Sequence, residues 1–262
     1  MEYGLPTSVG RRLGADRTPL IRGGRAIALA GVAGLAMLVA SCGHDSAERE
    51  YLTALRGEET GMGREAQIAH LDQAIAIAPR RAWYYETRAV YEIDLKQFDR
   101  ALADLDRDIE LIPRPYAYFL RGLVRCQNGE IARSIVDFDQ AIAGQPANTQ
   151  FYRGRSLARA ATGDAVGALQ DAEHLVSTVP QQGESYYARG VALALLGRDR
   201  EAVADFDRAA AIRPELAYVV AARARSHERL GEAAHAQADR EAFERLRGEH
   251  SGCALCLDPF RY

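Results

Sequence analysis

Two patterns of apolar residues divide the chain of 262 residues. Between residues 26 and 40 the sequence AIALAGVAGLAMLVA contains no charged side chain. Further along, apolar positions recur every three or four residues, so that in AVADFDRAAAI the side chains of Ala202, Phe206 and Ala209 share one helical face. The second pattern predicts amphipathic helices over residues 47–248, with a different kind of segment at each end of the chain.

The helical region repeats every 33 or 34 residues. This period is marked by prolines, at Pro79, Pro113, Pro146, Pro180 and Pro214. A tyrosine stands 28 residues before each proline, and a glycine stands 17 residues before three of them. Glycine suits a tight turn and proline ends a helix. Each unit is therefore predicted to be helix, turn, helix, turn, with about fourteen residues per helix. A sixth unit, without its proline, continues the register to residue 248.

This spacing of Tyr, small residue, Gly, Ala, aromatic, Ala and Pro resembles the tetratricopeptide repeat family, most completely in residues 118–146 and 186–214. The resemblance implies an all-α fold, a right-handed superhelical solenoid of about six helix-turn-helix units. The first unit departs from the pattern at Gln67 and the last at Arg240. Such deviations are expected of end units, because one face of each has no neighbouring repeat to cover it.

Charged residues also recur in step with the repeats and form a ladder along the array. Aspartates recur at Asp104, Asp137, Asp171, Asp205 and Asp239, in step with Arg88, Arg121, Arg155, Arg189 and Arg223. Two interpretations are open: a charged binding stripe, or Arg–Asp pairs that join the helices of a unit or of neighbouring units. Because the residues recur in every unit, the pattern favours the structural interpretation.

The uncharged run follows a basic leader with five arginines and two acids, the plan of a secretory signal peptide. It ends in VASC, which resembles the lipobox of bacterial lipoproteins. The resemblance implies a signal peptide at 1–41, a lipidated linker at 42–46 and a diacylglycerol with fatty acids such as palmitate on Cys42. An uncleaved membrane anchor is the alternative. By resemblance to enterobacterial sorting, Gly43 favours the outer membrane and a periplasm-facing protein.

Charge and composition exclude several function classes. The net charge is −3 and the pI is about 6.1, and loss of the leader leaves 28 basic against 34 acidic residues. No nucleic-acid partner is therefore expected. The sequence contains no glycine-rich phosphate loop, no His-Glu-x-x-His and no nucleophile elbow. We therefore expect no catalytic activity, no cofactor and no small-molecule substrate. The histidines are scattered singly, and only His227 and His235 fall close together, at an eight-residue separation that is no ligand spacing.

The segment 249–262 breaks the repeat and contains His250, Cys253 and Cys256 in the pattern His-x-x-Cys-x-x-Cys. A local disulfide between the two cysteines is the favoured interpretation in an oxidising compartment. Thiol redox chemistry or a metal site remains the alternative, and would make this a thiol or metal protein. Cys126 is then left free and is expected to be buried as a small hydrophobe.

In tetratricopeptide arrays the first helices of the units line a concave groove that takes a peptide or a partner's helix. Matched by register, the groove residues are Trp83, Glu86, Tyr116, Phe119, Arg153, Tyr187, Tyr218 and Arg225. Aromatic residues and arginine are common interface anchors, although such aromatics also pack between helices. The resemblance implies a lipid-anchored scaffold or adaptor that binds a protein or peptide. A permanent structural subunit of a membrane-associated assembly is the alternative.

Overall fold

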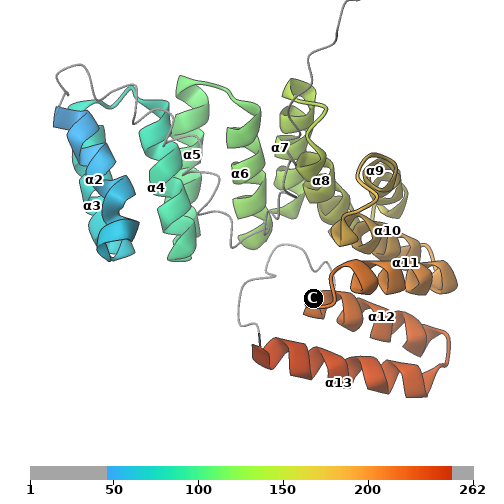
Figure 1. Ribbon diagram of the computed structural model, residues 1–262. Coiled ribbons are helices and arrows are strands. Elements are labelled where there is room, and N and C mark those ends of the chain that lie inside the picture. The colour runs from blue at the N-terminus through green and yellow to red at the C-terminus, as the bar shows by residue number, and fades with distance from the viewer. Residues whose placement is uncertain (1–45, 250–262) are drawn as a thin grey trace, which may run out of the picture. The chain divides into compact units, whose positions relative to one another are not determined.

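The computed structural model describes residues 46–249. The described part of the chain contains twelve α-helices and no strand (Figure 1). The predicted signal peptide, Cys42, His250, Cys253 and Cys256 lie outside the described residues. The helices are α2 (Ser46–Thr60), α3 (Arg64–Ile77), α4 (Ala82–Asp94), α5 (Phe98–Leu111), α6 (Pro115–Gln127), α7 (Ile131–Gly144), α8 (Thr149–Ala161), α9 (Ala165–Thr178), α10 (Gly183–Leu195), α11 (Asp199–Ile212), α12 (Ala217–Arg229) and α13 (Ala233–Glu249).

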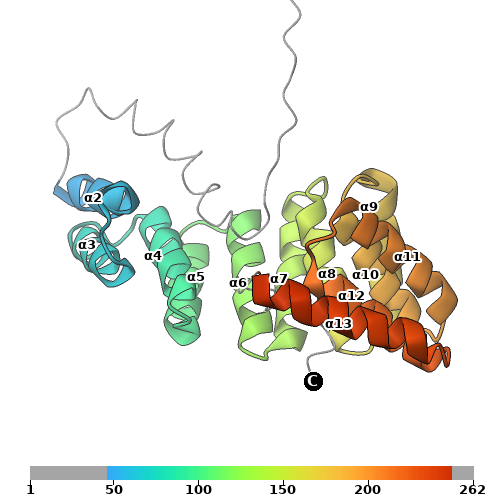
Figure 2. The ribbon, with the colours of Figure 1, turned by 60° about the horizontal axis from the view of Figure 1, so that its bottom comes forward.

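The helices form six consecutive pairs, each corresponding to one predicted unit. Within a pair the two helices pack together, and the second helix of each pair also packs on the first helix of the next (Figures 1 and 2). The first helices α6, α8, α10 and α12 contact one another in turn. This is the helical solenoid that the repeats predict. Within residues 46–249, no helix combines the length and apolar character needed to span a bilayer.

The turn inside each unit has a residue in the left-handed region of backbone conformation. Five of these residues are glycines, Gly61, Gly129, Gly163, Gly197 and Gly231, with φ between 73° and 86°. The second unit has Lys96 at this position, with φ 59°. The expectation that the mid-unit glycines form the turns is confirmed, because positive φ carries little cost for glycine alone.

Aromatic side chains from second helices fill the space left by glycines of first helices. Phe138 on α7 is fully buried between Gly122 of its own unit and Gly154 of the next. A methyl group added at either glycine would lie 2.8 Å from the ring. Phe206 has the same relation to Gly190, at 2.6 Å. The glycines that follow the ladder arginines Arg121 and Arg189 are therefore required by the close approach of a ring.

The core of the first unit contains a buried polar side chain. Gln67 is 1% exposed and lies over Gly57, the residue that leaves room for it. Its Nε2 donates a hydrogen bond to the carbonyl oxygen of Ala54, and its Oε1 accepts one from Arg64. A buried amide is tolerated here because its donor and acceptor both have partners.

Candidate protein-binding face

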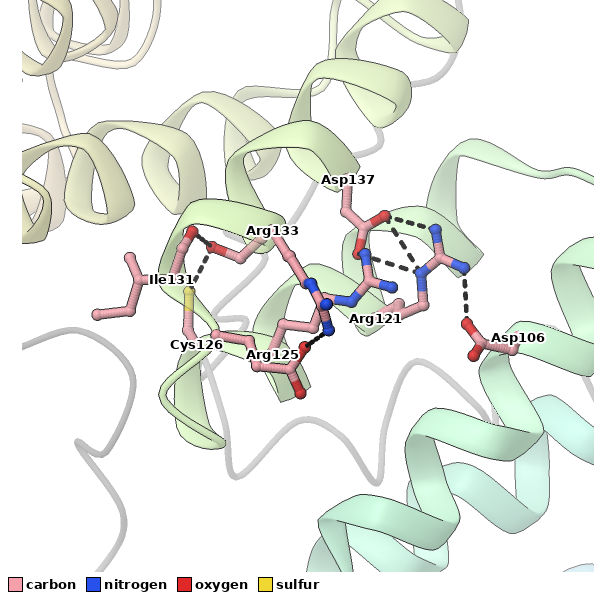
Figure 3. Close-up of polar contacts among 9 residues, drawn as sticks. Asp106, Arg121, Arg125, Cys126, Ile131, Arg133 and Asp137 are labelled. Carbon is pink, nitrogen blue, oxygen red and sulfur yellow. Dashed lines mark hydrogen bonds and ion pairs between the residues drawn. The ribbon is translucent and has the colours of Figure 1, made fainter.

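The charged ladder consists of bidentate ion pairs between the two helices of a unit. Arg121 on α6 lies 2.6 Å (Nη2 to Oδ1) from Asp137 on α7, and Arg125 reaches the same carboxylate at 2.8 Å (Figure 3). The equivalent pairs are Arg88–Asp104, Arg155–Asp171, Arg189–Asp205 and Arg223–Asp239. The aspartates of these pairs are buried, so the ladder satisfies charges inside the stack.

Four of the five ladder arginines also form an ion pair with an acid of the preceding unit. Arg121 Nη1 lies 2.7 Å from Asp106, as Figure 3 shows. The corresponding contacts are Arg88–Asp72, Arg155–Asp139 and Arg223–Asp207, and Glu173 is the acid beside Arg189. The guanidinium groups of Arg88, Arg121, Arg155 and Arg189 lie over the rings of Tyr85, Tyr118, Tyr152 and Tyr186, at 5.5–5.8 Å. The structural interpretation of the ladder is thus confirmed, and the recurrent tyrosines belong to it.

We use the name first-helix face for the surface formed by α4, α6, α8, α10 and α12. All eight residues predicted for the groove lie on these helices. They are Trp83 and Glu86 on α4, Tyr116 and Phe119 on α6, Arg153 on α8, Tyr187 on α10, and Tyr218 and Arg225 on α12. Five of them are half-buried, whereas Phe119, Arg153 and Tyr187 are buried, with 5%, 8% and 1% exposed.

Phe119 and Tyr187 pack between helices, as the alternative interpretation expected. The ring of Phe119 lies 5.0 Å from that of Phe151, and the ring of Tyr187 lies 4.6 Å from that of Tyr218. Contact with the next unit explains their burial, because each aromatic meets a residue of the following first helix. A single helical face in the sequence does not reveal that contact.

Two acids share one guanidinium at the junction of the second and third units. Arg114 Nη2 lies 2.6 Å from Glu86 and 2.7 Å from Asp108, whose side chain has no exposed surface. Burial raises the pKa of Glu86, and burial raises that of Asp108 to about 6 although Arg114 opposes the shift. Tyr116 adjoins the same charges, and burial raises its pKa. With both acids ionised, the group carries one surplus negative charge.

Trp83 lies one helical turn before Glu86 on α4, beside this acidic group. Its indole Nε1–H is buried and has no hydrogen-bond partner within residues 46–249, and Arg81 lies 5.2 Å from its ring. Sequence reasoning found Trp83 and Glu86 but missed Asp108 and Arg114. Little in the sequence signalled them, because an arginine follows Pro79 as well as Pro113.

A second charged group joins the fourth, fifth and sixth units. Arg153 and Arg213 both face Glu184, with Arg213 Nη1 at 3.0 Å from its carboxylate, and Arg213 also contacts Glu215. Burial lowers the pKa of Arg153, and the charge of Glu184 opposes that shift. Burial also raises the pKa of Tyr218. Arg153 and Tyr218, predicted separately, therefore belong to one balanced charge network.

Two histidines that are eight residues apart lie together in the last unit. The rings of His227 and His235 have centroids 5.1 Å apart, and Glu232 lies 2.6 Å from Nδ1 of His227. The interpretation that their eight-residue separation is no ligand spacing is wrong, because the turn between α12 and α13 folds one helix back on the other and brings both imidazoles to Glu232. Cys126 is free, as predicted, but it is half-buried and not fully buried as expected. Its thiol donates to Ser134 Oγ at 3.0 Å, and desolvation raises its pKa to about 11.

Comparison with solved structures identifies the fold. No family model and no curated protein matches the sequence. Among solved structures, a tetratricopeptide repeat protein from Parabacteroides merdae has a TM-score of 0.68 at 15% identity, covering 78% of this chain and 85% of that one. PilW, a type IV pilus biogenesis factor, has a TM-score of 0.64 at 18% identity, covering 82% and 98%.

A third solved structure is that of YrrB, described as a TPR protein with an unusual peptide-binding site, with a TM-score of 0.56 at 15% identity over 64% of this chain and 86% of that one. These likenesses agree with the repeat spacing, the paired helices and the glycine turns. The described chain therefore has the tetratricopeptide-repeat fold.

Proposed function

We propose that this protein is a non-catalytic scaffold that binds a protein or peptide on its first-helix face. The observation that carries the proposal is the tetratricopeptide-repeat fold with half-buried Trp83, Glu86 and Tyr116 gathered on that face. A rigid stack of helices presents such side chains in fixed positions, which reduces the entropy lost on binding. Tryptophan, tyrosine and arginine supply much of the binding energy at protein interfaces.

The charges near Trp83 indicate which partner groups fit. Glu86 and Asp108 share the single positive charge of Arg114, so this part of the face favours a basic side chain or N–H donors. The proposed partner therefore places a lysine or arginine near Glu86 and an apolar side chain against Trp83. Neighbouring half-buried Tyr116 adds an aromatic surface for the same partner segment.

The scaffold proposal is tested by crosslinking and affinity capture from membranes of the producing bacterium. Glu86→Gln removes the charge with little change of shape and is expected to weaken capture of the main partner at least about tenfold, the loss of one good charge pair. Glu110→Gln is the matched control, since Glu110 lies on the second helix of the same unit and is 65% exposed at its side chain.

Circular dichroism of both variants separates binding from folding. The proposal is rejected if Glu86→Gln and a second variant, Trp83→Ala, both fold and capture the same partners as the unmodified chain. A partner that stays bound at constant stoichiometry in every variant would instead favour a permanent structural subunit.

The same proposal includes a lipid at Cys42 that holds the protein on the periplasmic side of a bacterial membrane, with the outer membrane favoured. Its support is the uncharged run, the basic leader and the cysteine after VAS. Several acyl chains on one residue anchor a protein firmly. Labelled palmitate should enter the protein and be lost in Cys42→Ser, which should also move to the soluble fraction. Labelling that persists in that variant would contradict a lipid at Cys42.

A further inference from the structure

The last unit brings two imidazoles and a carboxylate together around its internal turn. His227 lies near the end of α12, Glu232 follows the turn and His235 is in the first turn of α13. Glu232 Oε2 lies 2.6 Å from His227 Nδ1 and 3.7 Å from His235 Nδ1. One ligand atom from each of the three residues lies within 4.8 Å of the others. The backbone fixes this arrangement, because Gly231 turns with φ 77° and the Glu232 amide donates to the His227 carbonyl at 2.9 Å.

The repeat register shows what is special about His227. In the third and fourth units the equivalent residues are Arg125 and Arg159, and each guanidinium lies within 2.9 Å of a ladder aspartate. In the last unit His227 occupies this place and its Nε2 lies 3.9 Å from Asp239. An imidazole replaces a permanent cation there, and its other nitrogen is directed at Glu232.

His227 therefore has a carboxylate on each side of its ring. A neutral imidazole has one N–H and so can donate to only one of them. Asp239 is already paired with Arg223, at 2.5 Å. Within the described residues, the ion pairs of Glu232 are those with the two imidazoles. Two imidazole nitrogens around one carboxylate form a donor set that a divalent transition metal would satisfy.

We propose that His227, Glu232 and His235 bind a divalent transition-metal ion, with Zn²⁺ as the probe. Zinc binds histidine nitrogen at about 2.0–2.1 Å and carboxylate oxygen at about 2.0–2.2 Å, so tetrahedral ligand atoms lie roughly 3.3 Å apart. The separations of 2.6 Å and 3.7 Å lie on either side of that value. Asp239 behind His227 would orient the ring, as carboxylates commonly do for metal-binding histidines.

The proposed ion joins α12 to α13 in the unit that has no following repeat among the described residues. His227 is buried and supplies the fixed ligand, whereas Glu232 and His235 are exposed, with side-chain exposures of 43% and 72%, and can adjust to the ion. Water would complete the coordination. The expected role is structural, because a metal that binds the folded state stabilises it.

The test is calorimetric titration of the full mature chain with Zn²⁺, together with its thermal unfolding. One equivalent should bind and raise the melting temperature, and EDTA should reverse the rise. His235→Ala should lower the affinity more than about tenfold, since even outer-shell partners of metal ligands contribute 10–100-fold. His70→Ala is the matched control, because His70 also lies 2.6 Å from a glutamate, Glu50, but belongs to no group of three ligands within the described residues.

A Cys253→Ser/Cys256→Ser variant separates this site from the cysteine pair. Binding that survives in that variant and is lost in His235→Ala supports the proposal. The proposal is overturned if no saturable binding occurs, or if His235→Ala binds as well as the unmodified chain. Loss of all binding in the cysteine variant would likewise overturn it and assign the metal to the cysteines.

Discussion

The single lysine of the chain lies where five of the six units have glycine. Lys96 adopts φ 59° in the turn between α4 and α5, a conformation in which a Cβ atom crowds the backbone. At the equivalent Gly197, no neighbouring atom would lie within 4 Å of an added Cβ. The cost of a side chain at this position is therefore a backbone cost, separable from any clash.

Lys96→Gly is expected to stabilise the protein by about 1 kcal/mol, because glycine adopts positive φ without the steric cost. The reciprocal change, Gly197→Lys, should destabilise it by a similar amount. Urea unfolding of both variants measures the two effects. Equal stability of Lys96→Gly and the unmodified chain would show that the turn in the second unit relaxes to accept the lysine.

Periodic residues were predictable from the sequence, and residues that depend on the next unit were not. The unit-ending prolines and the turn glycines follow from spacing, and spacing favoured the Arg121–Asp137 type of pair over a binding stripe. The burial of Tyr187 does not, because its partner Tyr218 belongs to the following unit. The contact between His227 and His235 was missed because it crosses a turn, where helical spacing rules do not apply. Of the candidate face, the helices were thus predicted, but which side chains are exposed was not.

At the scale of helices, one arginine forms two ion pairs in different surroundings. Arg155 on α8 pairs with buried Asp171 on α9 of its own unit and with half-exposed Asp139 on α7 of the unit before, whose side chains are 5% and 47% exposed. Arg159 adds a second contact to Asp171 at 2.9 Å. The pairs use the same guanidinium, so a comparison of them isolates the effect of burial.

Asp171→Asn should lower the free energy of unfolding by about 3 kcal/mol, because two arginines lose their shared buried partner. Asp139→Asn should lower it by less than about 1 kcal/mol, since water screens an exposed pair. Urea titration, which adds no salt, is the suitable measurement. Similar effects of the two substitutions would show that burial does not distinguish the pairs.

The contact between Phe138 and two glycines gives a second expectation for packing between helices. Gly122→Ala places a methyl group against the Phe138 ring, which Gly154 confines on its other side. Overpacking of this kind costs about 1–3 kcal/mol. Phe138→Leu should relieve it, so the double variant should be less destabilised than the sum of the two single variants. Strict additivity in thermal unfolding would exclude the proposed clash.

For the whole molecule, the second unit should make stability depend on pH. Glu92 is 4% exposed, and burial followed by the charge of Asp104 raises its pKa from 4.5 to about 7, with Arg88 and Arg100 opposing. Burial similarly raises the pKa of Asp108 to about 6. The folded state binds these two protons more tightly than the unfolded state. Protonation of the two acids therefore stabilises the fold at low pH, and this stabilisation is lost as the pH rises from about 4.5 to about 7.

Glu92→Gln removes the main group and should stabilise the protein by about 1–2 kcal/mol at pH 8, because ionised Glu92 is a buried charge beside Asp104 whereas glutamine is neutral. The advantage should disappear below pH 4.5, where Glu92 is protonated in both states. Thermal unfolding of the two proteins across this range measures the difference. An advantage that is independent of pH would mean that Glu92 does not titrate as described.

The ladder also determines how the length of the array can change. Each ladder arginine pairs with an acid of its own unit and lies beside one of the unit before, sixteen residues away in either direction for most of them. If the 34 residues 149–182 were deleted, Arg189 would meet Asp139 in place of Glu173. Asp139 would exchange the deleted Arg155 for Arg189, and Glu184 would lose Arg153 but keep Arg213. Recombination that removes this whole repeat should therefore keep the ladder matched, because the new junction carries the same ladder charges as the one it replaces.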